Sequence, residues 1–243
     1  MTVLAGWDAD LGDAVAAGRL GEAPADLAAF ESAFVRAVEA ADDCPSRAWN
    51  AFYDATLARV EAGWGQAEGR GTVATFSRIW AKAASLSRGP VVLDVGTCFG
   101  FLPLAWAVRT GAPRLLAVDV SPSATALAGR QARRLARPVD VLCADGARLP
   151  VGDRSVGTVL LVHVLEHLPP AAADRVLREA LRVATDRVVV AVPVEATPDP
   201  VFGHLQVFDL GSLARLGAST GWPADLHGSD GAWLVLDRPG NRP

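Results

Sequence analysis

The stretch Val91-Val92-Leu93-Asp94-Val95-Gly96-Thr97-Cys98-Phe99-Gly100 decides the fold of this chain. It is an apolar run of strand length that leads into a turn with two glycines and then into a helical pattern. A strand, a glycine-containing turn and a helix in this order are typical of the first unit of a doubly wound α/β sheet. We therefore expect a ligand to bind at this turn, where the carboxyl end of the first strand opens.

The rest of residues 89–243 continues the same alternation of short apolar runs and helical patterns. The expected strands are residues 91–95, 115–118, 139–143, 158–162 and 188–192, and the expected crossover helices are residues 101–109, 122–135, 171–184 and 210–220. This order predicts a mostly parallel sheet with helices on both faces. A last apolar segment, residues 232–236, is expected to form an edge strand.

Before residue 89 the apolar residues recur at helical spacing, and glycine, proline or small polar residues interrupt the pattern at 21–24, 44–46 and 63–71. We expect three or four helices there. The chain is thus expected to consist of a helical N-terminal extension, residues 1–88, and an α/β domain, residues 89–243.

Composition narrows the classes of protein to consider. Of the 243 residues, 51% are hydrophobic and 21% charged, which supports a buried core. The net charge of -4 includes no basic block, so nucleic acid is not an expected partner. Three cysteines without a C-x-x-C pair favour a reducing compartment, the cytoplasm. Neither a secretory signal nor an apolar run long enough for a membrane span is expected.

The glycine turn also distinguishes between possible cofactors. Asp119 closes the second expected strand, where its carboxylate can accept hydrogen bonds from a ribose diol. The dinucleotide pattern G-x-G-x-x-G is not met, because Cys98 stands at its second glycine, and this counts against NAD. A NAD-dependent oxidoreductase and a non-catalytic cofactor-binding protein nevertheless stay open as alternatives, since one fold hosts many functions.

The chain resembles the class I S-adenosylmethionine-dependent methyltransferases, whose first motif reads acidic-x-Gly-x-Gly-x-Gly. Asp94, Gly96 and Gly100 match this motif, and Cys98 departs from it. The resemblance continues through Asp119, through the segment 143–146 and through the segment 161–168. It implies a Rossmann-like methyltransferase sheet that binds S-adenosylmethionine. The implied cofactor-binding residues are Asp94, Gly96, Thr97, Gly100, Asp119 and Val120, with Asp145, Gly146 and Val162, of which Asp119 would meet the ribose and Asp145 the adenine amino group.

Two further segments, Val192-Pro193-Val194-Glu195 and Gly203-His204-Leu205-Gln206-Val207-Phe208, resemble a narrower family, the oligosaccharide methyltransferases of the mycobacterial mycofactocin system. This resemblance implies O-methylation of a glucose hydroxyl on a glycan attached to a peptide-derived redox cofactor. Residues 1–88 would then serve as a lid or as an acceptor-binding part. A quinone or another small molecule is the alternative acceptor, and the oligomeric state stays undefined.

An alcohol acceptor needs a base, and the chain has four histidines from which to choose. His163 directly follows the fourth expected strand, His167 lies one helical turn later, and His204 lies in the loop after the fifth strand. We predict these three as catalytic candidates, against the alternative that His167 packs its helix and His204 fixes its loop.

The spacing of His163, Glu166 and His167 also fits the H-x-x-E-H pattern of inverted zinc peptidases. That pattern requires a long helix, whereas His163 follows a strand, so a zinc hydrolase is disfavoured. Acidic residues with magnesium spacing are not evident, and we expect no metal.

Overall fold

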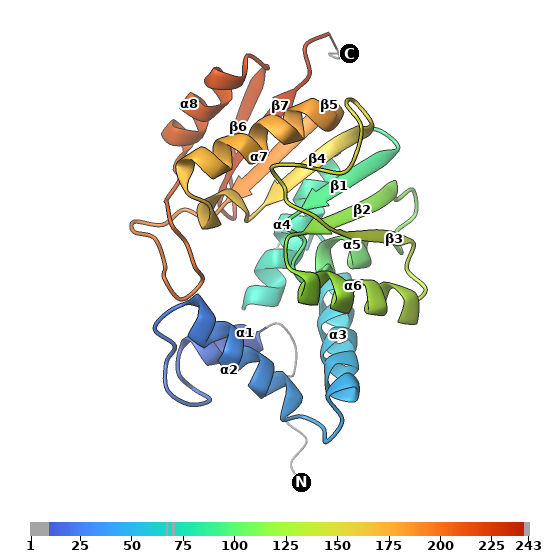
Figure 1. Ribbon diagram of the computed structural model, residues 1–243, viewed down its shortest axis with the longest axis vertical. Coiled ribbons are helices and arrows are strands. Elements are labelled where there is room, and N and C mark those ends of the chain that lie inside the picture. The colour runs from blue at the N-terminus through green and yellow to red at the C-terminus, as the bar shows by residue number, and fades with distance from the viewer. Residues whose placement is uncertain (1–9, 67, 70, 241–243) are drawn as a thin grey trace. The chain divides into compact units, whose positions relative to one another are not determined.

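The computed structural model describes residues 10–66, 68–69 and 71–240 and divides the chain into two compact units. One unit contains Met1–Lys82 together with Asp199–His204, and the other contains Ala83–Pro198 together with Leu205–Pro243 (Figure 1). The division falls six residues before the boundary expected from the sequence and assigns a short loop beyond residue 198 to the first unit. Among the helices that the structure describes, none is long and apolar enough to cross a membrane.

The first unit contains helical segments that begin and end where the sequence pattern is interrupted. Their bounds are α1 (Leu11–Ala16), α2 (Leu27–Glu39), α3 (Pro45–Ala62) and α4 (Thr72–Leu86), the last of which continues into the second unit. Helix α2 starts after Asp26, whose carboxylate accepts the N–H of Ala29 at 2.9 Å. Helix α3 starts with Pro45, a residue favoured in the first turn.

Aromatic side chains form the core of the helical unit. Phe52 and Tyr53 are almost fully buried, and the rings of Phe34 and Phe52 meet edge to face with centroids 5.5 Å apart. The loop Asp199–His204 belongs to the same unit because the ring of Phe202 packs on that of Phe30, at 5.4 Å. These aromatic residues therefore have a packing role, with the geometry that aromatic pairs prefer.

The second unit is a seven-stranded sheet with the strand order β3-β2-β1-β4-β5-β7-β6. The strands are β1 (Val91–Val95), β2 (Arg114–Asp119), β3 (Val139–Cys143), β4 (Val156–Val162), β5 (Ala184–Val192), β6 (Ala224–Gly228) and β7 (Ala232–Asp237). The helical segments of this unit are α5 (Phe101–Trp106), α6 (Pro122–Arg134), α7 (Pro170–Val183), α8 (Leu210–Thr220) and the 3-10 turn η1 (Leu165–His167).

The last two strands correct one expectation. Residues 232–236, expected at the edge, form β7, which pairs antiparallel with both β5 and β6. The edge strand is β6, which the sequence analysis did not identify. Its residues are all exposed, and the stretch Ala-Asp-Leu-His-Gly lacks the apolar run by which the buried strands were found.

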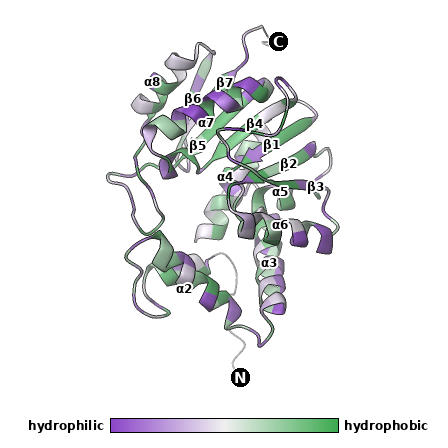
Figure 2. Cartoon of the chain, in the orientation of Figure 1, coloured by the Kyte–Doolittle hydropathy of each residue, from purple (hydrophilic) through white to green (hydrophobic). Residues whose placement is uncertain are grey.

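The core of the sheet lies along β4 and β5, every described residue of which is buried except at the start of β5. Figure 2 shows the hydrophobic colour along these central strands, whereas α6 and α7 carry much of the hydrophilic colour. Helix α7 packs its apolar stripe, which includes Val176 and Leu177, into the cluster that contains Leu93, Val95 and Leu161. The parallel pairing of β3, β2, β1, β4 and β5 brings the carboxyl ends of these strands to one edge.

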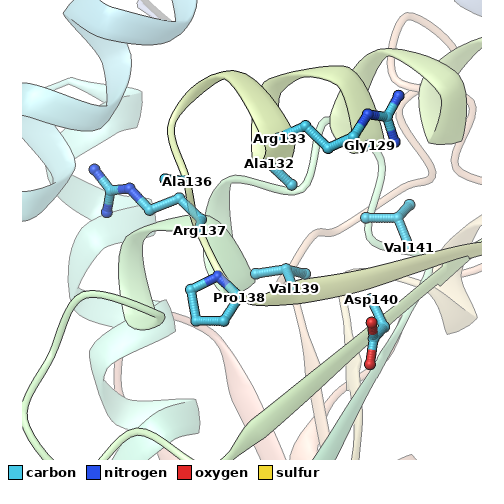
Figure 3. A pocket seen from close by; sticks show the side chains of 9 residues that line it. All are labelled: Gly129, Ala132, Arg133, Ala136, Arg137, Pro138, Val139, Asp140 and Val141. Atoms are coloured by element: carbon cyan, nitrogen blue, oxygen red, sulfur yellow. The ribbon is translucent and has the colours of Figure 1, made fainter.

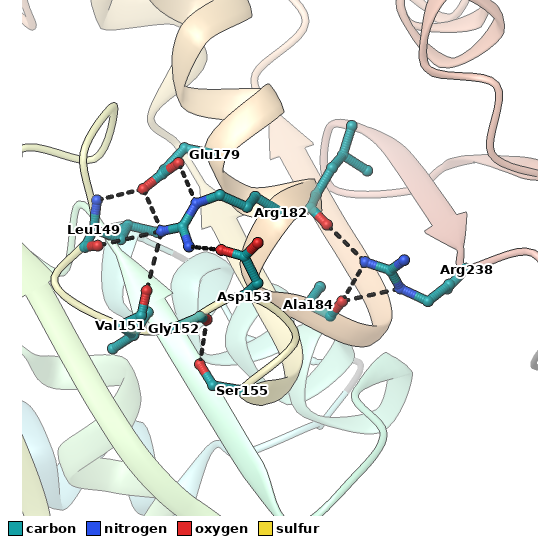
Figure 4. A network of polar contacts seen from close by, with 10 residues as sticks. Leu149, Val151, Gly152, Asp153, Ser155, Glu179, Arg182, Ala184 and Arg238 are labelled. Atoms are coloured by element: carbon teal, nitrogen blue, oxygen red, sulfur yellow. Dashed lines mark hydrogen bonds and ion pairs between the residues drawn. The ribbon is translucent and has the colours of Figure 1, made fainter.

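An arginine network fixes the chain just before β4. Arg182 donates from Nε to Glu179 at 2.8 Å and from a terminal nitrogen to the carbonyl of Val151 at 3.0 Å. Glu179 in turn accepts the N–H of Leu149 at 2.7 Å, and Arg238 donates to the carbonyls of Leu181 in α7 and of Ala184 at the start of β5 (Figure 4). The hydrogen bonds from Arg182 lower the pKa of the Glu179 carboxyl. The network ties the connection 149–153 to α7 and so supports the start of β4.

A second arginine is fully paired inside the same unit. Arg187 of β5 forms a two-pronged ion pair with Asp237 of β7, with nitrogen–oxygen distances of 2.7 and 3.0 Å. Its remaining terminal nitrogen donates to the carbonyl of Leu86 at 2.7 Å. Because both side chains are nearly inaccessible to solvent, this pair couples the end of α4 to the sheet.

Candidate active site

The order of strands reverses between β1 and β4, which is where doubly wound sheets bind their ligands. Strand β1 pairs in parallel with β2 on one side and with β4 on the other, and Val95 lies opposite both Val118 and Leu161. The residues that follow these strands therefore meet at one edge of the sheet. Gly96, Asp119 and His163 all come from this position in the chain.

The glycine turn after β1 is tightly packed. The N–H groups of Gly96 and Thr97 both donate to the carbonyl of Val118, at 2.8 and 3.0 Å. Gly96 and Gly100 each have a φ of 73°, a left-handed conformation that favours glycine. A Cβ at Gly96 would lie 2.6 Å from Cγ2 of Val164, closer than van der Waals contact allows. The turn therefore requires glycine at 96 and lies directly against the segment after β4.

Asp119 holds the turn from the neighbouring strand. Its Oδ2 accepts the N–H of Cys98 at 2.8 Å, and its Oδ1 accepts the N–H of Ser121 at 2.9 Å. A carboxylate offers about four acceptor positions, so two stay available after these bonds. Asp119 can thus accept from the hydroxyls of a ribose while it fixes the backbone of the turn, a structural role that the sequence did not reveal.

Asp94 lies inside β1 and is only 5% exposed. Burial raises the pKa of its carboxyl to about 7, a contact from the Thr97 side chain opposes the rise, and the charge of Asp119 adds to it. Near neutral pH this carboxyl is therefore partly protonated, whereas an ordinary surface aspartate is ionised.

The end of β3 lies beside the end of β2. Ala144 donates its N–H to the carbonyl of Asp119 at 3.0 Å, and the carboxylate of Asp145 accepts the N–H of Ala147 at 2.8 Å. This places Asp145 one strand away from Asp119.

The remaining residues expected at the cofactor occupy the same edge. Val120 follows β2 and is 71% exposed, whereas Val162 is buried at the end of β4. Gly146 approaches β1 so closely that a Cβ there would lie 3.0 Å from Cγ1 of Val95. The exposed valine gives the edge an apolar surface next to its carboxylates, a combination suited to a nucleoside.

His163 is the first residue after β4 and has an unusual backbone. Its φ is 56°, and its N–H donates to the carbonyl of Ala191 at 2.8 Å. Its Nδ1 lies 3.1 Å from Oε1 of Glu166, whose side chain is 1% exposed. A left-handed backbone is uncommon for a residue other than glycine and is often found at functional sites. Glu166, which the sequence analysis treated only as part of the zinc pattern, is thus paired with the first catalytic candidate.

The backbones of the other two candidate histidines make different hydrogen bonds. His167 ends η1 and donates its N–H to the carbonyl of Val164 at 3.1 Å. His204 belongs to the helical unit, where its N–H donates to the carbonyl of Asp199 at 2.9 Å. Only His163 and His167 thus share one short turn of the α/β unit.

These residues fit S-adenosylmethionine. Two carboxylates at adjacent strand ends can accept hydrogen bonds, and Val120 offers an apolar surface beside them. A hollow of about 470 Å³ lies elsewhere, between α6 and β3, and is lined by Arg133, Arg137 and Asp140 among others (Figure 3). It opens at the amino end of β3, away from the edge where such sheets bind ligands, so we do not assign the cofactor to it.

Comparison with known proteins agrees with this fold. Residues 93–192 match the family described as "Methyltransferase domain". No match is found among curated proteins. A solved S-adenosylmethionine-dependent methyltransferase from Aquifex aeolicus is similar in structure, with a TM-score of 0.52 and 20% identity, over 64% of this chain and 85% of that one.

Two other solved structures extend the comparison. The magnesium protoporphyrin IX methyltransferase of Synechocystis PCC 6803, with bound S-adenosylhomocysteine, gives a TM-score of 0.53 at 14% identity and covers 80% of this chain and 98% of that one. A cyclase, SpnF, gives 0.56 at 24% identity, over 72% and 71% of the two chains. The Rossmann-like fold is therefore that of the methyltransferases. The match over residues 93–192 assigns a methyltransferase domain to this part of the chain, and the similar solved structures share its fold.

Proposed function

We propose that this methyltransferase acts on oxygen and transfers the methyl group to a sugar hydroxyl, namely a glucose unit of a glycan or of a glycosylated redox cofactor such as the mycofactocin oligosaccharide. The observation that carries the proposal is His163, which stands beside the glycine turn with its Nδ1 3.1 Å from a buried carboxylate. An imidazole oriented by a carboxylate is a general base, and an alcohol acceptor needs one.

The residues of the chain divide the work of such a transfer. S-adenosylmethionine, when bound, supplies a methyl group activated by its positively charged sulfur. Gly96 and Gly100 would let the backbone approach the cofactor, while Asp119 would accept from its ribose and Asp145 from its adenine amino group. His163 would take the proton of the hydroxyl as the new bond forms. Much of the rate would come from alignment of the acceptor oxygen with the methyl carbon.

The class of acceptor rests on the sequence segments 192–195 and 203–208 and on the need for a base. A quinol or another small apolar molecule is the second candidate, and one observation favours it. Val194, Leu205 and Val207 follow β5 or precede α8 and are 62%, 58% and 39% exposed. Exposed apolar side chains on the loop after a central strand would suit an apolar acceptor.

The test begins with calorimetric titration of S-adenosylhomocysteine and, separately, of NAD into the purified chain. We expect micromolar binding of the former alone. Labelled S-adenosylmethionine is then offered with glucose oligosaccharides in one arm and with a quinol in the other, and products are identified by mass spectrometry. Methylated oligosaccharide that is lost in His163→Asn supports the proposal. Methylation of the quinol alone, or of neither acceptor with saturating cofactor, would overturn it.

We assign acceptor binding to the helical extension, residues 1–88. Trp64 lies half-buried in the turn after α3, whereas Phe52 and Tyr53 are core. Aromatic faces stack on sugars, so Trp64→Ala should raise the KM for the oligosaccharide and leave the binding of S-adenosylhomocysteine unchanged. An unchanged KM would remove Trp64 from the acceptor site.

A further inference from the structure

Glu166 is a buried carboxylate that lies beside imidazole nitrogens. Its side chain is 1% exposed, and neither carboxylate oxygen makes a well-aligned hydrogen bond with any residue in the described part of the chain. The imidazole Nδ1 of His163 lies 3.1 Å from Oε1, and an imidazole nitrogen of His167 lies within 4.8 Å of a carboxylate oxygen. Burying a carboxylate is unfavourable unless it is paired, so a residue of this kind needs a physical explanation.

The backbone around Glu166 is held in place by a neighbouring segment. The carbonyl of Glu166 accepts the N–H of Leu205 at 2.7 Å. The side-chain amide of Gln206 donates to the carbonyls of Leu165 and Leu168, at 2.9 and 2.8 Å. These bonds fix η1 through its main-chain carbonyls, and none of them involves the carboxylate of Glu166. Its position against His163 is therefore not explained by a structural role in the turn.

We propose that Glu166 is a positioning residue, which accepts the Nδ1–H of His163 and so keeps Nε2 as the nitrogen that takes the proton. The proposal rests on the proposed O-methyl transfer. The hydrogen bond that one ring nitrogen makes decides which nitrogen carries the proton in a neutral imidazole. The 3.1 Å contact is within ion-pair distance but does not meet hydrogen-bond geometry, and Nε2 of His163 is buried. Hydrogen bonds of catalytic pairs often tighten only when substrate is bound.

The proton balance of the step follows from this arrangement. The acceptor oxygen forms its bond to the methyl carbon while the bond from that carbon to sulfur breaks, and the electron pair stays on sulfur. The hydroxyl proton moves to Nε2 of His163, which becomes an imidazolium with Nδ1 facing Glu166. The carboxylate then lies next to the positive charge that it helped to create, which favours the products of the proton transfer.

The test measures the tautomer of His163 directly by nitrogen NMR, on the full chain with labelled histidine and S-adenosylhomocysteine as the added probe. The chain has only four histidines, so His163→Asn assigns the signal. At alkaline pH, where imidazoles are neutral, we expect the wild type to carry the proton on Nδ1. Glu166→Gln should keep this tautomer, because its amide oxygen still accepts, and Glu166→Met should lose it. His227, on the exposed strand β6, is the internal control.

The outcomes are separate from those of the proposed function. A proton on Nε2 in the wild type, or an unchanged tautomer in Glu166→Met, would overturn the positioning role whatever the acceptor is. If Glu166→Met does not fold, the wild-type spectrum decides alone. With a glucose oligosaccharide that the wild type methylates, Glu166→Met should lower kcat roughly 100-fold with little change in KM, and Glu166→Gln should recover part of the loss. If the wild type does not methylate the oligosaccharide, the proposed acceptor is wrong, but the tautomer measurement still tests the role of Glu166.

Discussion

Gly96→Ala is the substitution that most directly tests the geometry of the cofactor turn. Two effects act on it: the φ of 73° is unfavourable for alanine, and the new Cβ would lie 2.6 Å from Cγ2 of Val164. The conformational effect alone costs about 1–2 kcal/mol. The close contact must be relieved by movement of either the turn or the segment that carries His163, so we expect a larger total, about 3 kcal/mol.

Gly221→Ala provides the matched control. Gly221 has a φ of 71°, almost the same as that of Gly96, but a Cβ there would meet nothing within 4 Å. In urea unfolding, Gly221→Ala should lower the free energy of unfolding only by the conformational cost, about 1 kcal/mol. The variant should bind S-adenosylhomocysteine like the wild type. Calorimetry of Gly96→Ala should show affinity for S-adenosylhomocysteine reduced by at least about tenfold, or about 1.4 kcal/mol.

A double substitution separates the contact from the backbone effect. Val164→Ala removes the methyl group that the new Cβ meets, so in the Gly96→Ala background it should restore part of the lost stability. If Gly96→Ala and Gly221→Ala lose equal stability and both bind S-adenosylhomocysteine normally, then the close packing of the turn against the segment after β4 is refuted as a determinant of the site.

The remaining predictions concern single groups. The pKa of Asp94 in the folded chain, about 7, lies above its ordinary value of 3.8. The protonated carboxyl therefore contributes its full share of the folding stability below about pH 4, and this share is lost as the pH rises to about 7. The stability of Asp94→Asn relative to the wild type should therefore rise, by a few kcal/mol at most, between about pH 4 and about pH 7 in urea unfolding and stay constant above that. Asp237→Asn leaves Arg187 buried without its charge partner and should cost about 3–5 kcal/mol, whereas Asp140→Asn, in an exposed ion pair, should cost less than about 1 kcal/mol. Gln206→Leu removes two hydrogen bonds to η1 and should lower methyl transfer more than it lowers the binding of S-adenosylhomocysteine, in paired kinetic and calorimetric measurements.

Local sequence patterns were sufficient for most of the sheet. The strands at 91–95 and 139–143 and the helix at 210–220 have the bounds that the pattern predicts, because buried strands are apolar runs and helix α8 begins at a capping aspartate, Asp209. Strand β6 could not be found in this way. It is exposed on both faces, and its pairing with β7 depends on hydrogen bonds that a hydropathy pattern does not record.

The candidate site was predictable only in part, for a similar reason. Glycines and acidic residues at strand ends carry a signal in the sequence, since their spacing is set by one strand and its turn. The contacts of Asp119 with Cys98 and of Gly96 with Val164 join segments far apart in the chain, and the order of strands creates them. The spacing of His163 and Glu166 was visible, but it fits a zinc pattern equally well, and only the structure shows the buried carboxylate facing the imidazole.

Backbone strain gives an independent reason to regard this edge as functional. In the described part of the chain five residues other than glycine have positive φ, and two of them, Cys98 and His163, follow the adjacent strands β1 and β4. Such a conformation is unfavourable by about 1–2 kcal/mol for an ordinary side chain, and glycine would relieve it. Strain is expected to persist where the side chain itself is needed. At position 163 the side chain is an imidazole beside a buried carboxylate, and a glycine would lack this imidazole. Since the same fold also serves a cyclase, the activity of this chain depends on that placement of side chains and not on the sheet that carries them.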